Sequence, residues 1–185
     1  MQCVNILVKS LNFFHLAMKI PHLDGLPPCV RSDCQIMIFG SMPSAASLRA
    51  GGYYAHPQNR FWPVMGHILQ FNPHLEPSIR LAALQAHRIG LWDVIGRCRR
   101  RGSLDAAIEV ASIQVNPIAS LLASLAQLER ILCNGAVAHQ VWKQKVAATL
   151  TANYTVVQLP STSAANASWS MEALVRQWRR ALDGS

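Results

Sequence analysis

Two neighbouring segments of the chain carry the side chains best suited to chemistry. The first, residues 40–44, is a small-residue turn (Gly-Ser-Met-Pro-Ser) that follows an apolar run. The second, residues 53–62, combines aromatic rings and a histidine with the amide of Asn59. A strand that leads through such a turn into an aromatic, amide-bearing segment before a helix is typical of a binding loop.

Short, almost wholly apolar runs predict the strands that must position these segments, and such runs are typical of strands buried on both faces. Between and after them, apolar residues at three- and four-residue spacing predict helices that open at Asn59, Ser78 and Asn116, and a last helix near the C-terminus. The four predicted strands are residues 34–39, 89–95, 130–133 and 154–159. Strands that alternate with helices predict an α/β fold, here a single three-layer α/β/α domain around a central, mainly parallel four-stranded sheet.

The carboxyl ends of parallel strands form the edge at which ligands bind in such folds. Four loops are expected there: residues 40–59, 93–101, 134–135 and 161–166. No glycine-rich dinucleotide loop, P-loop or G-x-S-x-G nucleophile elbow occurs, so the signatures of dinucleotide, triphosphate and α/β-hydrolase sites are missing.

Composition limits the class of protein and of partner. With 185 residues, 51% hydrophobic and 14% charged, the chain has the length and balance of one folded domain. Its formal net charge is +8, and all but four of its 17 basic residues are arginines, which bind phosphate in bidentate fashion. This excess favours a polyanionic partner such as nucleic acid.

The five cysteines form no C-x-x-C pair, so neither a zinc ribbon nor a disulfide framework is indicated. We expect buried apolar thiols in a reducing cytoplasm; the alternative is that Cys29 and Cys34 help to hold an iron–sulfur cluster. Residues 1–24 are expected to be an N-terminal extension and residues 25–185 the domain. Charged residues and a histidine interrupt residues 1–20, which argues against a signal peptide and a membrane span.

Three motifs point further: residues 40–44, residues 54–62 (Tyr-Ala-His-Pro-Gln-Asn-Arg-Phe-Trp) and residues 159–166 (Leu-Pro-Ser-Thr-Ser-Ala-Ala-Asn). Together, and in this order, they resemble the uracil-DNA glycosylase superfamily and, within it, the hypoxanthine (deoxyinosine) DNA glycosylase family. The resemblance runs from about residue 25 to the C-terminus. It implies a monomeric enzyme of base excision repair that flips a deaminated base out of double-stranded or single-stranded DNA and hydrolyses its bond to deoxyribose.

Met42 is the main departure from the relatives. In the mismatch-specific uracil and thymine glycosylases, whose middle motif is similar, an Asn at the matching position places the attacking water, and a thioether cannot do so. The resemblance to the hypoxanthine family implies Asn59 as the catalytic residue instead, with its side-chain carbonyl orienting the water while its amide donates. From spacing alone, the better interpretation of Asn59 is a helix N-cap.

The resemblance also implies a group of residues around the extruded base. Tyr54 stands where relatives place an aromatic residue that stacks on the base. His56 is expected to contact the base or a phosphate; its alternative is a loop histidine whose ring bonds to the backbone. Asp93 ends the second predicted strand, where relatives line the pocket; its alternative is a turn cap. The predicted base-binding residues are Gly40, Ser41, Met42, Tyr54, His56 and Asp93.

The last motif is a hydroxyl-rich turn before the final helix, and such turns bind phosphate or cap the helix. Some relatives fill the gap in the base stack with a Leu from this turn, but the matching residue here, Ala165, is too small to be a strong wedge. The densest arginine run lies in the loop after the second strand. The predicted DNA-binding residues are Ser161, Thr162, Ser163, Asn166, Arg97 and Arg99.

None of the four lysines lies in a predicted loop, whereas a glycosylase that also cuts the strand needs an amine to form a Schiff base. We therefore expect hydrolysis to an abasic site, with no metal or organic cofactor and no membrane partner. The alternatives are a non-catalytic nucleic-acid-binding protein of the same fold, a mismatch-specific uracil or thymine glycosylase, and a small-molecule hydrolase that uses Ser41 or Ser44.

Overall fold

A central parallel sheet organises the computed structural model, which describes residues 20–184. Its strands lie in the order β3-β2-β6-β7 and are all parallel, and each residue of β2 and β3 is buried. The bounds are β2 Ile36–Gly40, β3 Ile89–Asp93, β6 Arg130–Asn134 and β7 Thr155–Leu159. The four predicted strands and the mainly parallel α/β fold are thus confirmed.

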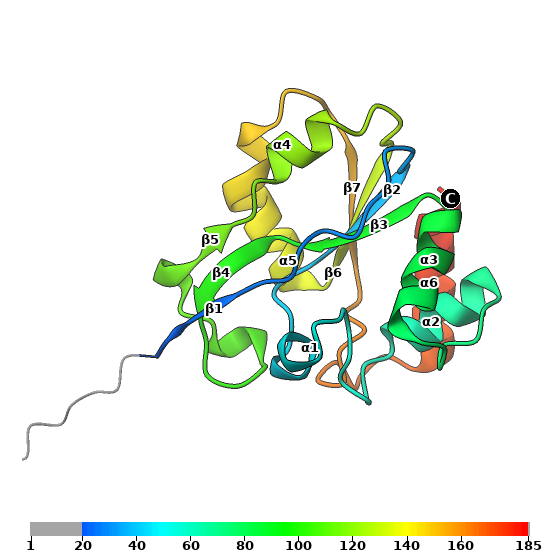
Figure 1. Cartoon of the computed structure of the whole chain (residues 1–185), viewed down its shortest axis with the longest axis horizontal. Helices are drawn as coiled ribbons and strands as arrows, with labels where there is room; N and C mark the ends of the chain where they lie inside the picture. Colours follow the sequence, from blue (N-terminus) through cyan, green and yellow to red (C-terminus); the bar gives the residue numbers. More distant parts are fainter. Residues whose placement is uncertain (1–19, 185) are drawn as a thin grey trace, which may run out of the picture.

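Helices cover both faces of this sheet and give the three predicted layers (Figure 1). α2, α3 and α6 lie on one side of the sheet, and α4 and α5 lie on the other, while α1 sits near the carboxyl ends of the strands. The helix bounds are α1 Ala45–Ala50, α2 Phe61–Leu69, α3 Pro77–Ala86, α4 Ile118–Ala123, α5 Ala136–Val141 and α6 Met171–Asp183. The predicted helices correspond to α2, α3, α4 and α6; the sequence did not predict α1 and α5.

A second, antiparallel sheet was also not predicted. It has the order β1-β4-β5, with β1 His22–Asp24, β4 Ile95–Arg99 and β5 Gln114–Val115. Val94 alone separates β3 from β4, so the chain passes directly from the central sheet into this smaller one. β1 pairs with β4 although it lies within the predicted N-terminal extension, of which residues 1–19 are outside the described residues.

The loops that follow β2, β3, β6 and β7 leave the sheet at one edge, as parallel strands require. Serine side chains cap the first turns of two helices near this edge. Ser44 caps α1 by accepting from the Ser47 N–H, and Ser170 caps α6 by accepting from the Ala173 N–H. Among the described residues, no helix is long and apolar enough to cross a membrane.

Candidate active site

A cavity of about 620 Å³ opens at the carboxyl edge of the central sheet, where the sequence predicted the site. Its walls come from the loops after all four strands and from residues 103–106. The predicted site residues that line it are Gly40, Ser41, Met42, Tyr54, Asn59, Asp93, Ser161, Thr162, Ser163 and Asn166.

A chain of hydrogen bonds fixes the side chain of Asn59. Asn134 accepts from the Thr162 N–H through Oδ1 (3.0 Å), so its Nδ2 is the group that donates to Thr162 Oγ1 (2.9 Å). The Thr162 hydroxyl must then donate to Asn59 Oδ1 (3.1 Å), which also accepts from the Phe61 N–H (3.0 Å). The N-cap position of α2 is Arg60, so Asn59 stands one residue before it; its oxygen still accepts from the first residue of α2, while its amide nitrogen is left over.

This arrangement changes the chemistry that Asn59 can offer. Both lone-pair directions of its carbonyl oxygen are occupied, and no acceptor for its Nδ2 group is found among the described residues. Since Asn59 lines the cavity, Nδ2 is the group available to a ligand or water there. The sequence predicted water orientation through the carbonyl, whereas the structure makes Asn59 a donor.

Asp93 and Tyr54 meet at Gly40 on the inner wall of the cavity. Gly40 and Asp93 are partners in neighbouring strands, and a Cβ at position 40 would overlap Asp93 Oδ1 and lie 3.1 Å from the Tyr54 hydroxyl. Glycine is therefore required at position 40 by close approach. Asp93 Oδ2 is buried without a hydrogen-bond partner, and the Tyr54 hydroxyl lies near the Asn134 amide without a hydrogen bond of normal geometry among the described residues. Two buried polar groups without a normal partner thus lie together in residues of the cavity wall, and such groups usually have a structural or functional reason.

Burial also sets the charge of Asp93. The side chain is only 3% exposed, and burial raises its pKa to about 7, with a further increase from the nearby Asp105 carboxylate and a decrease from Arg100. A carboxyl group with such a pKa is partly neutral near pH 7 and can donate a proton or a strong hydrogen bond. The alternative role, a solvated turn cap, does not fit this environment.

Asp105 is a site residue that the sequence pattern did not indicate. Both of its carboxylate oxygens accept from the Ser41 hydroxyl, at 2.8 and 2.7 Å, and it lines the cavity. Burial raises its pKa, while the Ser41 hydrogen bond and Arg100 lower it. Because 64 residues separate Ser41 from Asp105, no local sequence pattern could have joined them.

The Tyr54 ring is already stacked within the protein. Its centroid lies 3.9 Å from that of Phe61 with the rings 21° apart, so Phe61 covers one face of Tyr54. Tyr54 has a φ of 53°, a left-handed conformation that is strained for a residue with a side chain and is common in functional loops. Stacking on an extruded base would use the other ring face.

Arg100 stabilises the turn that follows β2. The guanidinium is 3% exposed and donates to the carbonyl oxygens of Met42, Pro43 and Gly102. This member of the arginine run is therefore neither a solvated side chain nor available to phosphate, because it is buried and bound to the backbone. Met42 itself is 6% exposed and lines the cavity as an apolar wall.

Arg60 joins the second motif to the third. Its guanidinium donates to the carbonyl oxygens of Ser163 (3.2 Å), Asn166 (2.7 Å) and Trp169, and its backbone N–H donates to Thr162 O (2.9 Å). These bonds hold the loop between β7 and α6 against the start of α2. Arg60 therefore positions the wall that carries Thr162, and through it Asn59.

Replacing Arg60 by alanine should destabilise the fold and loosen this wall. Loss of three hydrogen bonds from a charged donor is expected to lower the free energy of unfolding by about 2 to 4 kcal/mol, and so the Tm by about 5 to 10 °C. Arg49→Ala, at an exposed position near the end of α1, is the matched control. Equal Tm values for the two variants would contradict the role of Arg60.

Four predicted site residues make other contacts than the DNA or base contacts that the resemblance implies. His56 is exposed and outside the cavity lining, and its Nδ1 accepts from the Gln58 N–H (3.2 Å). Arg97 and Arg99 pair with acidic residues of the small sheet region, at 3.6 and 2.7 Å, and do not line the cavity either. Thr162 is fully buried, so the prediction that its hydroxyl contacts the DNA backbone is corrected: it orients Asn59 instead.

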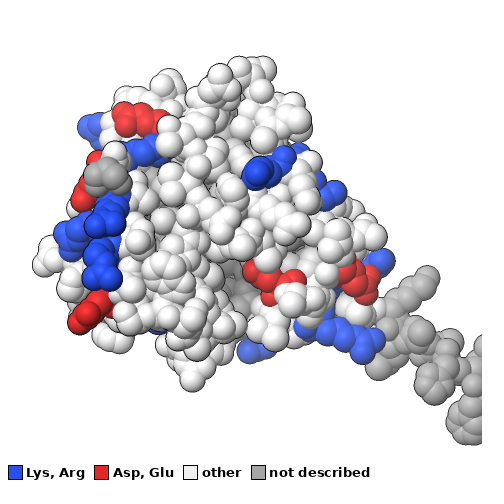
Figure 2. All heavy atoms as spheres, turned by 180° about the vertical axis from the view of Figure 1, so that it is seen from behind, with Lys and Arg blue, Asp and Glu red and all other residues white. Residues whose placement is uncertain are grey.

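Basic side chains gather away from the cavity. Figure 2 shows Lys and Arg in a column on the side where α6 lies, whereas acidic side chains lie beside a hollow nearer the middle of this face. No Lys or Arg is among the described residues that line the cavity.

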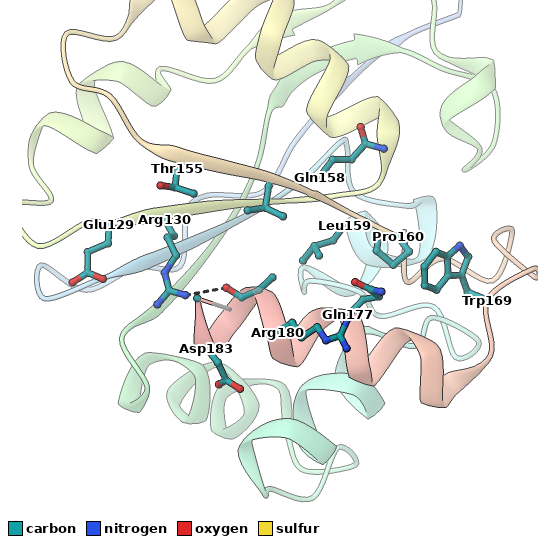
Figure 3. Close-up of a pocket in the computed structure, with 13 residues that line it drawn as sticks. Glu129, Arg130, Thr155, Gln158, Leu159, Pro160, Trp169, Gln177, Arg180 and Asp183 are labelled. Atoms are coloured by element: carbon teal, nitrogen blue, oxygen red, sulfur yellow. Dashed lines mark hydrogen bonds between the residues drawn. The ribbon is translucent and has the colours of Figure 1, made fainter.

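A larger cavity of about 1070 Å³ lies between β7 and α6 (Figure 3). It shares the wall of residues 158–160 and Trp169 with the first cavity. Arg130 crosses its far end and donates to the Ala181 carbonyl (3.0 Å). No residue that lines this groove has a buried polar atom without a hydrogen-bond partner among the described residues. The groove therefore offers fewer groups that could bind or act on a ligand than the cavity around Asp93 and Asn59.

No group of three or more His, Cys, Asp or Glu side chains within residues 20–184 is arranged to hold a metal ion. The four cysteines in this range are free thiols: Cys34, Cys98 and Cys133 are buried and Cys29 is partly buried. Burial raises the pKa of the Cys34 thiol to about 11 and that of Cys133 to about 12, which suits structural rather than reactive thiols.

Comparison with known proteins agrees with the motifs. The sequence model of the uracil DNA glycosylase superfamily matches residues 27–183. Two relatives named hypoxanthine DNA glycosylase, from Methanosarcina barkeri and Methanosarcina acetivorans, are 35% and 34% identical over 112 residues, which cover 60% of this chain and 70% of each relative.

The fold agrees as well. The solution NMR structure of a candidate uracil DNA glycosylase from Methanosarcina acetivorans has a TM-score of 0.71 and 30% sequence identity, over 88% of this chain and 99% of that chain. The motifs, the sheet order and the cavity at the carboxyl edge all lie within the matched range. The chain belongs to the uracil DNA glycosylase superfamily and, within it, is similar to proteins named hypoxanthine DNA glycosylases, as its motifs predicted.

Proposed function

We propose that this protein is a monofunctional DNA glycosylase of base excision repair that flips hypoxanthine out of DNA and hydrolyses its N-glycosidic bond. The observation that carries the proposal is the convergence of the Asn59 amide, the Asp93 carboxyl and the Tyr54 hydroxyl on one cavity. The names of the two relatives support hypoxanthine as the base. Extrusion is needed because the sugar C1′ and the base edge are inaccessible inside a duplex.

Asp93 would act on the leaving base. Departure of the base leaves negative charge on its ring, and a donor placed where that charge develops lowers the barrier. The neutral Asp93 carboxyl can donate its proton to the base and so serve as a general acid. The Tyr54 hydroxyl beside it supplies a second donor, since burial raises the pKa of Tyr54 and keeps it protonated.

Asn59 would hold the attacking water. The Nδ2 group can donate to a water oxygen and place it near C1′ while the other lone pair of that oxygen faces the sugar. An oxocarbenium-like sugar needs a positioned water more than a strong base, so a donor is sufficient: the water oxygen bonds to C1′ as the bond to the base breaks, and the proton that the water loses passes to solvent. The hydrogen bonds from Thr162 and Phe61 keep the amide in this orientation.

Hydrolysis would leave an abasic site without strand cleavage. A lyase reaction needs an amine, and neither Lys143 nor Lys145 lines the cavity. The partner is DNA that contains a deaminated base, and the free, mostly buried thiols support the predicted reducing, cytoplasmic setting.

The purified protein should make strands that contain hypoxanthine labile to alkali. Parallel substrates with uracil, xanthine or mismatched thymine rank the bases, and borohydride trapping reports any Schiff base. We expect cleavage at hypoxanthine and no trapped complex. Binding to DNA without cleavage of any substrate would favour a non-catalytic binding protein, and a trapped complex would overturn the monofunctional mechanism.

A further inference from the structure

Leu104 stands out among the exposed apolar side chains. Four large hydrophobic residues of the described chain are strongly exposed: Ile79 at 50%, Leu104 at 60%, Val110 at 72% and Met171 at 39%. Single exposed hydrophobic residues are common on protein surfaces. Leu104 differs from the other three because it also lines the cavity of the candidate active site.

The backbone on both sides of Leu104 is anchored. Before it, the Ser103 hydroxyl accepts from the Ala45 N–H (3.0 Å) and Arg100 donates to the Gly102 carbonyl (3.1 Å). After it, the Asp105 carboxylate accepts from the Ser41 hydroxyl, and the Leu104 carbonyl accepts from the Ala107 N–H (3.0 Å). The Leu104 side chain is thus exposed at the rim of the cavity, while its backbone is held in place. The hydrogen bond between Asp105 and Ser41 joins this loop to the turn after β2, which also lines the cavity.

The loop after β7 forms another part of the cavity wall. Its residues Ser163, Ala165 and Asn166 line the cavity together with Trp169, which packs partly buried against the core, and the residue at the position of the wedge in some relatives is the small Ala165. When a base leaves a duplex, the stack must be closed by something, and proteins that open base steps commonly insert a Leu, Ile, Met or Phe. A protruding Leu can therefore fill the gap in the base stack, for which the Ala165 side chain is too small.

We propose that Leu104 is the wedge that enters the base stack and fills the gap left by the extruded base. The proposal rests on the glycosylase function proposed above. It assigns to residues 102–106 a role that the third motif does not supply: keeping the extruded base from returning to the duplex while hydrolysis takes place. A wedge matters only where neighbouring bases are stacked and paired, so its effect should depend on the DNA partner strand.

The test compares single-turnover rates on one hypoxanthine-containing strand, either alone or in a duplex. Leu104→Ala should lower the duplex rate by about tenfold or more because unstacking is no longer compensated, and should leave the single-strand rate within about twofold. Leu104→Met, which conserves volume and apolar character, should retain most of the duplex rate. Val110→Ala, at an exposed apolar residue outside the cavity lining, should change neither rate.

Two results would overturn the wedge. Equal loss on both substrates would mean that Leu104 supports the loop or the cavity rather than the opened duplex, and no loss on the duplex would mean that Leu104 is dispensable. Failure of the proposed function gives a separate result, since wild-type protein would then cleave neither substrate. In that case the inference falls with the function on which it rests.

Discussion

Replacement of Asn59 by alanine is expected to lower the single-turnover rate of base release by about 100-fold or more, the usual cost of one donor lost from a reacting site. The reason is that Nδ2 is the part of Asn59 available to the cavity, whereas Oδ1 is occupied by Phe61 and Thr162. Affinity for lesion-containing DNA should change far less, because Asn59 is proposed to act on the water rather than on the DNA backbone. Rates with excess enzyme, beside binding curves, check both statements.

Asn59→Asp separates the two roles that an amide could have. Aspartate keeps the acceptor for the Phe61 N–H but replaces the Nδ2 donor by an oxygen. If the donor holds the water, this variant should be nearly as slow as Asn59→Ala. Activity close to wild type would instead show that a carbonyl or carboxylate oxygen orients the water, and would contradict the assignment made from the hydrogen-bond network.

Asn72 provides the matched control for local structure. Its Oδ1 accepts from the His74 N–H (2.9 Å), the same two-residue interaction that Asn59 makes with Phe61, but Asn72 lies outside the cavity lining. Asn72→Ala should therefore lose a similar local bond and keep full activity. A comparable loss of rate in both variants would assign the effect of Asn59→Ala to the start of α2 rather than to catalysis.

The central sheet could be predicted because its strands are buried on both faces. β2 and β3 have no solvent-facing side, so their sequences are continuous apolar runs that need no knowledge of the partner strands. Parallel strands also have their carboxyl ends at one edge, which places the loops that follow them together. Gly40, Asn59 and Asp93 could therefore be grouped from the sequence alone.

The small sheet could not be predicted for the opposite reason. β1 and β5 have three and two residues, and β4 contains two of the arginines that the sequence presents as one charge run. Tertiary pairing resolves that run into different roles: Arg97 and Arg99 form ion pairs at the surface, while Arg100 is buried beneath the first loop. A run of like residues in the sequence does not indicate which of them will face the backbone of a distant segment.

The carboxylates show the same limit within the site. Asp93 could be predicted because it ends a strand, but its partially neutral state depends on burial and on Asp105, which approaches only in the folded chain. The orientation of Asn59 depends in the same way on Asn134, the last residue of β6, and on Thr162 in the loop after β7. Residue types and strand ends locate a site, whereas protonation and hydrogen-bond direction follow from contacts that are distant in sequence.

Replacement of Asp93 by asparagine is expected to slow base release by about 100-fold near pH 6.5, because an amide cannot transfer a proton to the leaving base. In the wild type, the rate should fall as pH rises through the Asp93 pKa of about 7, since only the protonated carboxyl can act. Asp93→Asn should show no such fall. Asp105→Asn should move the midpoint to lower pH, because removal of the neighbouring charge lowers the pKa of Asp93.

Ionisation of Asp93 should also lower the free energy of unfolding as pH rises. The folded-state pKa of about 7 lies above the ordinary value of 3.8, so the native state binds this proton more tightly than the unfolded state, and its contribution to stability is lost as pH rises between these values. The difference corresponds to about 4 kcal/mol. Asp93→Asn, which carries no charge, should therefore resemble the wild type at pH 4 and have a Tm about 5 °C or more higher at pH 8.5.

Thermal unfolding from pH 4 to 8.5 and single-turnover rates from pH 5.5 to 8.5 test the two halves of this prediction. The charged groups near Asp93 are Asp105 and Arg100, with the protonated Tyr53 and Tyr54 beside it, and the Arg100 guanidinium acts against the shift. Asp24→Asn, at an exposed position in β1, controls for a general change of charge.

A wild-type rate that stays level or rises above pH 7, or a Tm difference between Asp93→Asn and the wild type that does not grow with pH, would contradict a neutral Asp93. A group that is costly to ionise in the fold and required in its protonated form for catalysis should show both dependences at once, whereas a buried residue that only lines the cavity should show the pH dependence of stability alone.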